Sequence, residues 1–440
     1  MKTSVRSFLA VGIITAALAV RFAFAEKKTP GADFVAHEWG TFTSVQGADG
    51  VQFDWNPFVA PDLPNFVYDI ARPDGAKPGS VRPGHFSFGK LSMTSRLRME
   101  TPVIYFYSEK ERTVDVDVRF NGGRITEWYP QLTDAKAQAI QAIATAGQFR
   151  DGGRMHWSEV MLRPGADGAK LFPSDGTGSH YYAARETDAV PLRVKAADGT
   201  EQHEKFLFYR GVAGFDAPLR VQQSGENADV LTVENAAKQP MSALFVLSVR
   251  GDRAALVPVE PLNAGESRSV ECDFGKLSRP LAEVRPCIAA KMRSALVADG
   301  LYEKEAAAMV KTWDDSWFAE QGTRVLYTLP QQWTDGILPL AVTPAPKEVR
   351  RVFVGRAELI TPAKEWALLR QVVRFAEGDE AAKAAATKSV HAMNLGRFTA
   401  PALTRVMRAG PQAIEFRRAV SAMIESIRPA APKALAKANQ

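Results

Sequence analysis

The chain has 440 residues, of which 46% are hydrophobic and 24% charged, and its formal net charge at pH 7 is +6. This composition is that of a folded globular protein and excludes wholesale disorder. The length exceeds that of one comfortable hydrophobic core, so two or three domains are expected.

The first 25 residues have the pattern of an export signal. Lys2 and Arg6 are followed by 13 apolar residues (8–20), and Ala23 and Ala25 fit an A-x-A cleavage site. An apolar run of this length falls short of the roughly 20 residues that span a bilayer. The pattern therefore predicts a cleaved signal peptide over residues 1–25, an extracytoplasmic location (periplasmic or secreted) and no transmembrane anchor after cleavage. Nucleic acid is a poor partner for such a chain.

Residues 26–275 are predicted to form a β-rich body, with one or two sandwiches. Residues 34–45 and 99–107 are rich in β-branched and aromatic side chains, and residues 114–120 alternate strictly between apolar and charged. A helix is expected at 133–146 and an irregular loop at 56–84, and the short strands within 205–275 resemble an immunoglobulin-like sandwich in pattern.

Residues 276–361 change to a helical pair followed by returning strands. Apolar residues recur at helical spacing over 284–296, with Gly300 as the stop, and a second helix is expected over 304–318. Strand patterns return at 324–329 and 349–359. The expected fold class is thus α+β: a predominantly antiparallel β-sandwich body with a helical insertion and an all-helical C-terminal tail.

The tail, residues 362–440, begins at Thr361-Pro362, which fits an N-cap followed by Pro at the first helical position. Trp366, Leu369, Val373 and Ala376 recur at three- and four-residue steps and predict a buried stripe that docks on the body. Residues 347–440 hold 17 Lys and Arg against 8 Asp and Glu. This basic segment either is an ordinary solvated surface or contacts an anionic envelope surface.

Two cysteines remain after signal cleavage, Cys272 and Cys287. An even number in an oxidising compartment predicts one disulfide, with two separate thiols as the alternative.

Familiar catalytic motifs are incomplete. His37-Glu38 begins like a zinc-protease signature, but Thr41 stands where the second His is required. Histidines can still meet from distant strands, and the candidates for a shared metal site are His37, His85, His156 and His180. Structural, hydrogen-bonded histidines are the alternative. The sequence leaves the cofactor undetermined.

The candidate catalytic residues are those whose neighbours could tune a carboxylate or an imidazole: His37, Glu38, Glu100, His180 and Glu186. Glu38 shares its strand face with small and apolar residues, which could raise its pKa and make it a general acid. Glu100 could equally be ion-paired with Arg98. His180 and Glu186 lie by the glycine-containing loop 175–182, and tryptophans in the same half suit either sugar rings or a hydrophobic core.

Several strings resemble blocks found in a group of exported bacterial proteins to which no activity is assigned: HEWGTFT (37–43), METPV (99–103), TEWYP (126–130), HYYAARE (180–186) and DSWF (315–318). The resemblance covers most of residues 35–360. It implies a bacterial, extracytoplasmic context and supplies no catalytic residue.

Two functions follow as hypotheses. The first is an exported envelope protein that acts as a binding or structural module, with carbohydrate or an anionic envelope surface as its partner. The alternative is a metal- or carboxylate-dependent hydrolase acting on envelope or extracellular polymer, for which at least three of the five candidate side chains must converge in one pocket.

Overall fold

A computed structural model describes residues 34–54, 63–70, 72–73, 95–133, 152–165, 170–225 and 228–427. The predicted signal peptide, nearly all of the predicted helix at 133–146, most of the loop at 56–84 and His85 lie outside these residues. Within the described ranges, no helix has the length and hydropathy to cross a membrane.

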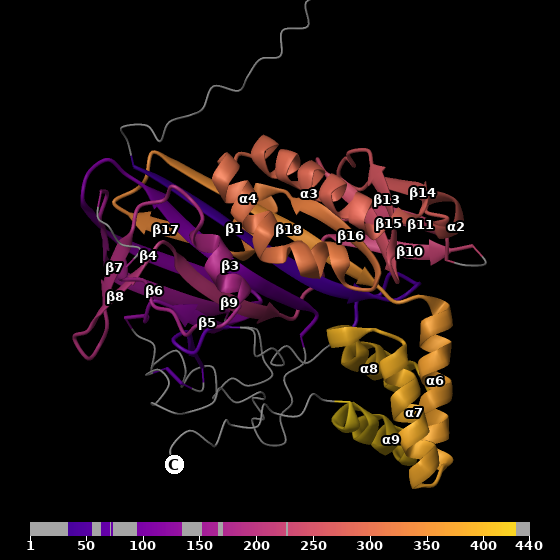
Figure 1. Cartoon of the computed structure of the whole chain (residues 1–440). Helices are drawn as coiled ribbons and strands as arrows, with labels where there is room; N and C mark the ends of the chain where they lie inside the picture. Colours follow the sequence, from indigo (N-terminus) through magenta and orange to yellow (C-terminus); the bar gives the residue numbers. More distant parts are fainter. Residues whose placement is uncertain are drawn as a thin grey trace, which may run out of the picture.

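The body is built on a ten-stranded sheet (Figure 1). Its strand order is β15-β13-β12-β16-β18-β1-β3-β9-β5-β2. The strands are β1 (Val35–Gln46), β2 (Tyr68–Asp69), β3 (Leu97–Tyr107), β5 (Gly123–Tyr129), β9 (Leu207–Ala213), β12 (Leu244–Arg250), β13 (Arg253–Val259), β15 (Arg279–Pro280), β16 (Gly322–Leu329) and β18 (Glu348–Leu359). The predicted strands at 34–45, 99–107 and 349–359 are confirmed.

At the centre of this sheet, the first strand of the body, β1, lies beside its last strand, β18. Strand β1 pairs in parallel with β18 over its whole length and antiparallel with β3. All 12 residues of β1 are buried, as expected for a strand covered on both faces. The predominantly antiparallel sheet that the sequence predicts therefore contains one parallel pair at its core.

Two smaller antiparallel sheets complete the described β structure. A three-stranded sheet has the order β10-β11-β14, and a five-stranded sheet has the order β17-β4-β6-β7-β8. Their strands are β4 (Arg112–Phe120), β6 (Gly153–Leu162), β7 (Leu192–Lys195), β8 (Glu201–Glu204), β10 (Leu219–Ser224), β11 (Val230–Asn235), β14 (Ser267–Glu271) and β17 (Leu340–Thr343). In β4 the valines and Phe120 are buried and Asp115 is exposed, which confirms the alternation that the sequence predicts.

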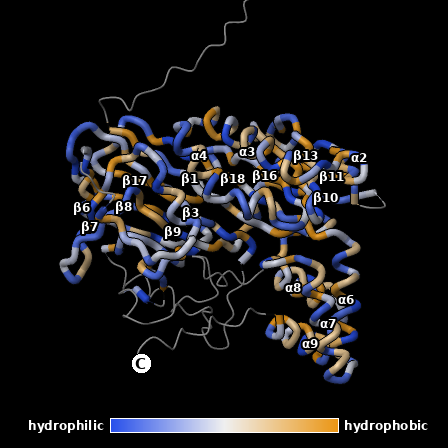
Figure 2. Tube along the Cα trace, viewed as in Figure 1, coloured by the Kyte–Doolittle hydropathy of each residue, from blue (hydrophilic) through white to orange (hydrophobic). Residues whose placement is uncertain are grey.

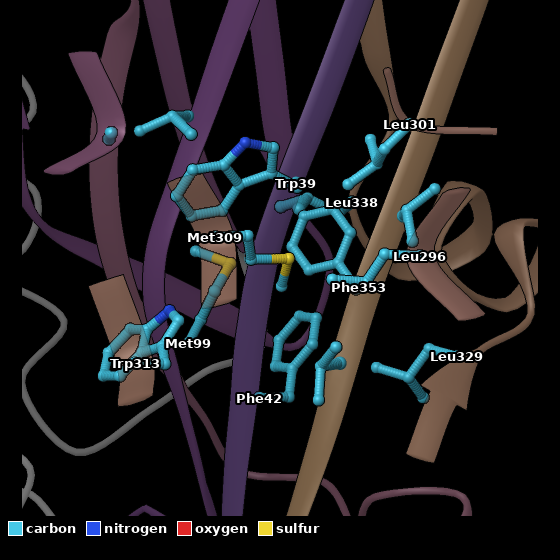
Figure 3. Packing of buried hydrophobic residues seen from close by; sticks show 14 of the residues in the cluster. Trp39, Phe42, Met99, Leu296, Leu301, Met309, Trp313, Leu329, Leu338 and Phe353 are labelled. Carbon is cyan, nitrogen blue, oxygen red and sulfur yellow. The ribbon is translucent and has the colours of Figure 1, made fainter. Parts of the chain in front are cut away.

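Helices α3 (Leu281–Ala298) and α4 (Glu303–Asp314) lie over one face of the large sheet (Figure 1). Gly300 ends the first helix with φ +113°, as its position predicts. Met309 and Trp313 of α4 pack with Trp39 of β1 and Phe353 of β18 in the main hydrophobic core (Figure 3). Within the described part of the body, the other short elements are the α-helices α2 (Phe274–Leu277) and α5 (Gln331–Ile337), the 3-10 turn η2 (His180–Arg185) and the π-turn η3 (Asp315–Ala319).

The C-terminal region is helical and projects from one end of the sheet (Figure 1). It comprises α6 (Pro362–Glu377), α7 (Glu380–Ala392), η4 (Gly396–Phe398), α8 (Thr399–Ala409) and α9 (Ile414–Ser426), here called the helical unit. Thr361 caps α6 by accepting from the Lys364 amide, as its sequence position predicts. Hydrophobic and hydrophilic residues are intermixed along these helices (Figure 2).

The helical unit docks on the body through a second hydrophobic core that includes Val45, Phe53 and Ile360. The prediction of which face of α6 makes this contact is wrong. Leu368 and Val372 of α6 are buried, whereas Trp366 is 62% exposed and Val373 36% exposed. Leu369 is half-buried and Ala376 is exposed. The stripe that the sequence predicts to be buried is thus mostly exposed, although Leu369 packs against this core.

The predicted disulfide is also wrong. Cys272 and Cys287 are both free thiols, the first buried and the second exposed. Cys272 directly follows β14, and its Sγ lies 3.2 Å from the carbonyl oxygen of Asp229. Cys287 is on α3, whose buried side carries Val284 and Ile288, so its thiol points to solvent.

Candidate functional site

The first unusual feature is a backbone irregularity where β1 and β3 meet. The pairing of β1 with β3 shifts between Trp39 and Thr41, and the pairing of β3 with β9 shifts between Met99 and Val103. Thr101 has φ +46°, a left-handed conformation that is rare for a β-branched residue. These bulges lie within the HEWGTFT and METPV strings and re-aim the side chains around Glu100.

Glu100 is buried among groups that favour its ionised form. One oxygen lies 2.6 Å from Nη1 of Arg397 and 3.3 Å from Nε of Arg98, and the other accepts a hydrogen bond of 2.6 Å from Thr43. Burial alone would raise the pKa of this carboxyl. The charges of Arg397 and Arg98 and the bond from Thr43 outweigh burial and lower the pKa to about 2.

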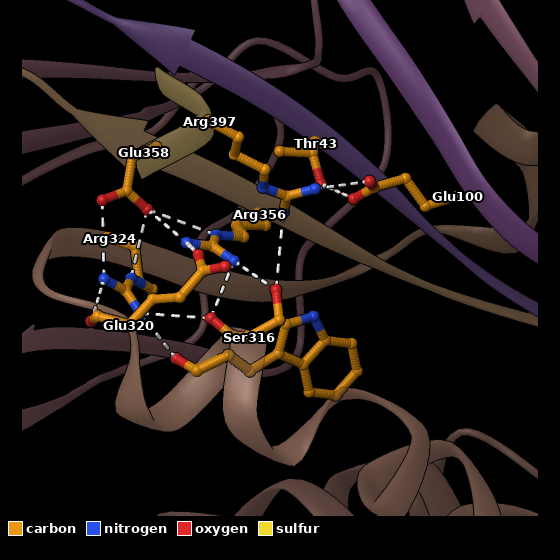
Figure 4. Close-up of polar contacts among 9 residues, drawn as sticks. Thr43, Glu100, Ser316, Glu320, Arg324, Arg356, Glu358 and Arg397 are labelled. Atoms are coloured by element: carbon orange, nitrogen blue, oxygen red, sulfur yellow. Dashed lines mark hydrogen bonds and ion pairs between the residues drawn. The ribbon is translucent and has the colours of Figure 1, made fainter. Parts of the chain in front are cut away.

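The contacts continue from Arg397 into a buried ion network (Figure 4). Arg356 donates to Oγ of Ser316 at 2.7 Å, and its guanidinium lies 2.8 Å from Glu358 and 2.6 Å from Glu320. Arg324 lies 3.1 Å from the same Glu358. Ser316 is part of the π-turn η3, a kind of irregularity that often occurs at functional sites.

A cavity of about 260 Å³ adjoins this network, lined by Glu320, Gln321 and residues 394–398. Each of the carboxylates Glu100, Glu320 and Glu358 is paired with at least one of the arginines Arg98, Arg324, Arg356 and Arg397. Carboxylates paired in this way hold parts of a fold together and do not act as free bases. Because Arg397 belongs to the helical unit, the network joins that unit to the body.

A second concavity lies between α6 and α8 and is open to solvent. This groove has a volume of about 390 Å³ and is lined by Ala48, Asp49, Pro362, Glu365, Trp366, Leu369, Arg405, Val406, Ala409 and Gly410. Its wall on the body side is the turn after β1, where the Gly50 amide donates to the carbonyl of Gly47 at 3.0 Å. Hereafter we call this concavity the α6–α8 groove.

Charged side chains form one wall of the α6–α8 groove. Arg405 lies 2.5 Å from Asp49 and 3.9 Å from Glu365, and its guanidinium also lies over the ring of Phe53. Burial raises the pKa of Glu365, and the nearby Asp49 adds to this effect while Arg405 opposes it. A carboxyl with a raised pKa in a cleft is a mark of a functional site. Trp366, the next residue on α6, adds an exposed aromatic ring to the lining.

His37 and Glu38 are paired on separate faces of β1. His37 Nδ1 lies 2.8 Å from Glu305 of α4, which also accepts from Tyr107 at 2.8 Å. Glu38 lies 2.6 Å from Nε of Arg351 and accepts from the hydroxyl of Tyr209. These partners differ from Arg397, Arg98 and Thr43, which contact Glu100, so the structure does not bring these three candidates together.

The other candidates lie elsewhere. Glu186 is paired with Lys311 of α4 on the surface, at 2.6 Å. His180 begins η2, and His156 lies 3.8 Å from Asp117 on the five-stranded sheet. Among the residues that the structure describes, no group of three or more His, Cys, Asp or Glu side chains could hold a metal ion. The candidate metal site is therefore not found among the described histidines His37, His156 and His180, and His85 lies outside the described residues.

Hydrogen bonds to Asp175 hold the glycine-containing loop 175–182 in place. Asp175 accepts from the Tyr182 hydroxyl at 2.7 Å and from the Asn65 amide at 2.8 Å. Trp39, Trp128 and Trp157 are fully buried, so they form core and cannot stack on a ligand. Sequence reasoning missed Asp49, Glu365, Arg405 and Trp366 as one site, because three of them come from the helical tail and their meeting depends on its docking.

Comparisons with known proteins give no family for this chain. No family model matches it, and no curated protein matches it. Among solved structures it is similar to the yeast delta-COP-I mu-homology domain, alone (5% identity, TM-score 0.28) and complexed with a Dsl1 WxWxV peptide (6% identity, TM-score 0.27). Each match covers 74% of this chain and 98% of the other. Likeness at this level carries no argument about function.

Proposed function

We propose that this chain is an exported bacterial envelope protein that works as a binding module, and that the α6–α8 groove is its binding site. We also infer that its sheets pack as a β-sandwich that carries the helical unit. The observation behind the binding site is Trp366, a large aromatic residue left 62% exposed at the rim of a groove of about 390 Å³. Grooves of this size that combine aromatic and charged lining are typical of ligand sites.

The groove and the ion network differ in how their carboxylates are paired with arginine and exposed to solvent. In the network around Arg356, Glu100 and Glu358 are buried and paired with arginine, and Glu320, whose side chain is 40% exposed, lies 2.6 Å from Arg356. In the groove, the side chains of Asp49 and Glu365 stay 47% and 23% exposed, so a ligand can reach them. The hydrolase alternative rests on His37, Glu38, Glu100, His180 and Glu186, which contact different partners, and it is not favoured by this arrangement.

The test is co-sedimentation of the mature protein with an isolated bacterial envelope fraction. The wild-type protein should sediment with the envelope, and Trp366→Ala should remain largely in the supernatant. Ile414→Ala is the matched control, because Ile414 is also an exposed apolar residue (57%) of the helical unit but does not line the groove. Equal sedimentation of all three proteins would refute the groove as the binding site.

A further inference from the structure

The chemistry of the α6–α8 groove narrows the class of ligand. Two carboxylates, Asp49 and Glu365, share one arginine, Arg405, so the charged wall has no excess of positive charge. An anionic ligand would meet repulsion from this wall. The occupant that fits is neutral or cationic.

The lining of the groove offers two kinds of contact to a ligand. Trp366 and Leu369 on α6, with Val406 and Ala409 on α8, provide apolar contact. Asp49, Glu365 and Arg405 provide carboxylate oxygens that accept hydrogen bonds and a guanidinium that donates them. A ligand that uses both kinds of contact has an apolar face and an edge of hydroxyl or amide groups.

A pyranose ring has this form, with C–H groups on its faces and hydroxyls around its edge. An exposed indole is suited to stack on such a face because it is large, rigid and weakly hydrated. The volume of about 390 Å³ lies at the lower end of small-molecule sites, which matches a short oligosaccharide. The open rim would let a longer chain continue beyond the groove.

We infer that the α6–α8 groove binds a short stretch of glycan built from neutral or N-acetylated amino sugars. One ring stacks on Trp366, and its hydroxyl or amide groups hydrogen-bond to Asp49, Glu365 and Arg405. This inference rests on the proposed function and adds the chemical class of the ligand to it.

The competing occupant is an anionic membrane surface. The outer side of α6 carries Trp366 and Val373 beside the exposed Arg370, a combination that can also bind anionic lipid. The groove argues against it, because an anionic bilayer would face two carboxylates, Asp49 and Glu365, that share only one arginine. The two occupants differ in their dependence on Arg370, which does not line the groove.

The test is a titration of the full mature protein with defined probes, followed by tryptophan fluorescence and calorimetry. The probes are an N-acetylglucosamine trimer, a neutral glucose tetramer and vesicles of phosphatidylglycerol. We expect saturable binding of at least one oligosaccharide. Trp366→Ala should weaken it by about tenfold, since the variant loses both the stacking contact and the apolar area that the indole buries. Glu365→Ala should weaken it as well, and Arg370→Ala should leave it unchanged.

The result decides between the two occupants. Absence of saturable binding to both oligosaccharides would overturn the glycan inference, as would equal affinity of wild type and Trp366→Ala. Binding to vesicles alone, lost in Arg370→Ala, would overturn it in favour of lipid. The proposed function is judged separately: if Trp366→Ala loses the envelope fraction while neither oligosaccharide binds, the groove remains a binding site for another ligand.

Discussion

Arg397 of the helical unit reaches into the body and places its Nη1 2.6 Å from Glu100, a residue of β3 that lies 297 positions earlier in the chain. The contact closes a line of buried charges that runs from β3 to β16 and β18 (Figure 4). A buried ion pair contributes less than its Coulomb energy suggests, because both groups lose hydration. Removing one partner nevertheless destabilises the fold strongly, since the other charge stays buried without its counter-charge.

Glu100→Gln should therefore destabilise the protein strongly at neutral pH. The folded pKa of about 2 lies below the ordinary 4.5 of a glutamate, so ionised Glu100 stabilises the native state. This stabilisation is fully present above pH 4.5 and is lost as the pH falls toward 2. We expect a loss of about 3 kcal/mol at pH 7. Urea unfolding measured at pH 7, 5 and 3 should show the wild-type and variant curves converging as the pH falls.

The control for this experiment is Glu186→Gln, which breaks the surface pair with Lys311. Exposed pairs contribute about 0–1 kcal/mol, so this variant should unfold close to wild type. If the gap between Glu100→Gln and wild type stays constant from pH 7 to pH 3, the ionised state of Glu100 is not what stabilises the fold.

A second prediction concerns the two apolar faces of α6. Leu368 is fully buried in the core of the helical unit, so Leu368→Ala should cost about 2–5 kcal/mol. Trp366→Ala, on the exposed face, should change stability by about 0.5 kcal/mol or less. Guanidinium unfolding and limited proteolysis of the helical unit measure both effects. Faster cleavage of Trp366→Ala than of Leu368→Ala would mean that the outer face is the docked one.

This pair also shows how far the sequence alone could predict the fold. Alternation in β4 and the Thr361 N-cap are local patterns, and the structure confirms both. On α6 two apolar stripes run side by side. One contains Trp366, Leu369 and Val373, and the other contains Leu368 and Val372, each one position before a member of the first. Local periodicity cannot tell which of two such stripes meets the body, because that choice is made by the surface that the body offers.

The candidate sites could be predicted only in part, because their residues are brought together by the docking of the helical unit on the body. Glu100 could be recognised as a candidate for an ion pair with Arg98, and that contact exists at 3.3 Å. Its stronger partner, Arg397, comes from a helical unit whose position the sequence does not specify. The α6–α8 groove likewise unites Asp49 in the turn after β1 with Arg405 on α8, and no short motif records such a meeting.

A third prediction tests the close packing at the bulge of β1. A Cβ at Gly40 would lie 2.7 Å from the ring of Phe353 and 3.0 Å from the Cα of Pro102. Gly40→Ala should therefore destabilise by about 1–3 kcal/mol, since the backbone of Pro102 cannot easily give way. Gly336 in α5 has open space around its Cα, so Gly336→Ala should be neutral or stabilise by about 0.5–1 kcal/mol. Thermal unfolding of the two variants checks the contrast, and an equal effect of both would contradict the tight approach.

The last prediction is that Cys272 and Cys287 are both free and react at very different rates. Cys287 is exposed on α3. Cys272 is buried, and desolvation together with the nearby Asp229 raises its pKa to about 11. Because the thiolate is the reactive form, Cys272 should react slowly in the native protein. Titration with a thiol reagent should show one fast and one slow thiol in native protein and two in denatured, unreduced protein. Cys287→Ser should remove the fast thiol alone. Denatured, unreduced protein without any free thiol would restore the disulfide that the even cysteine count predicts.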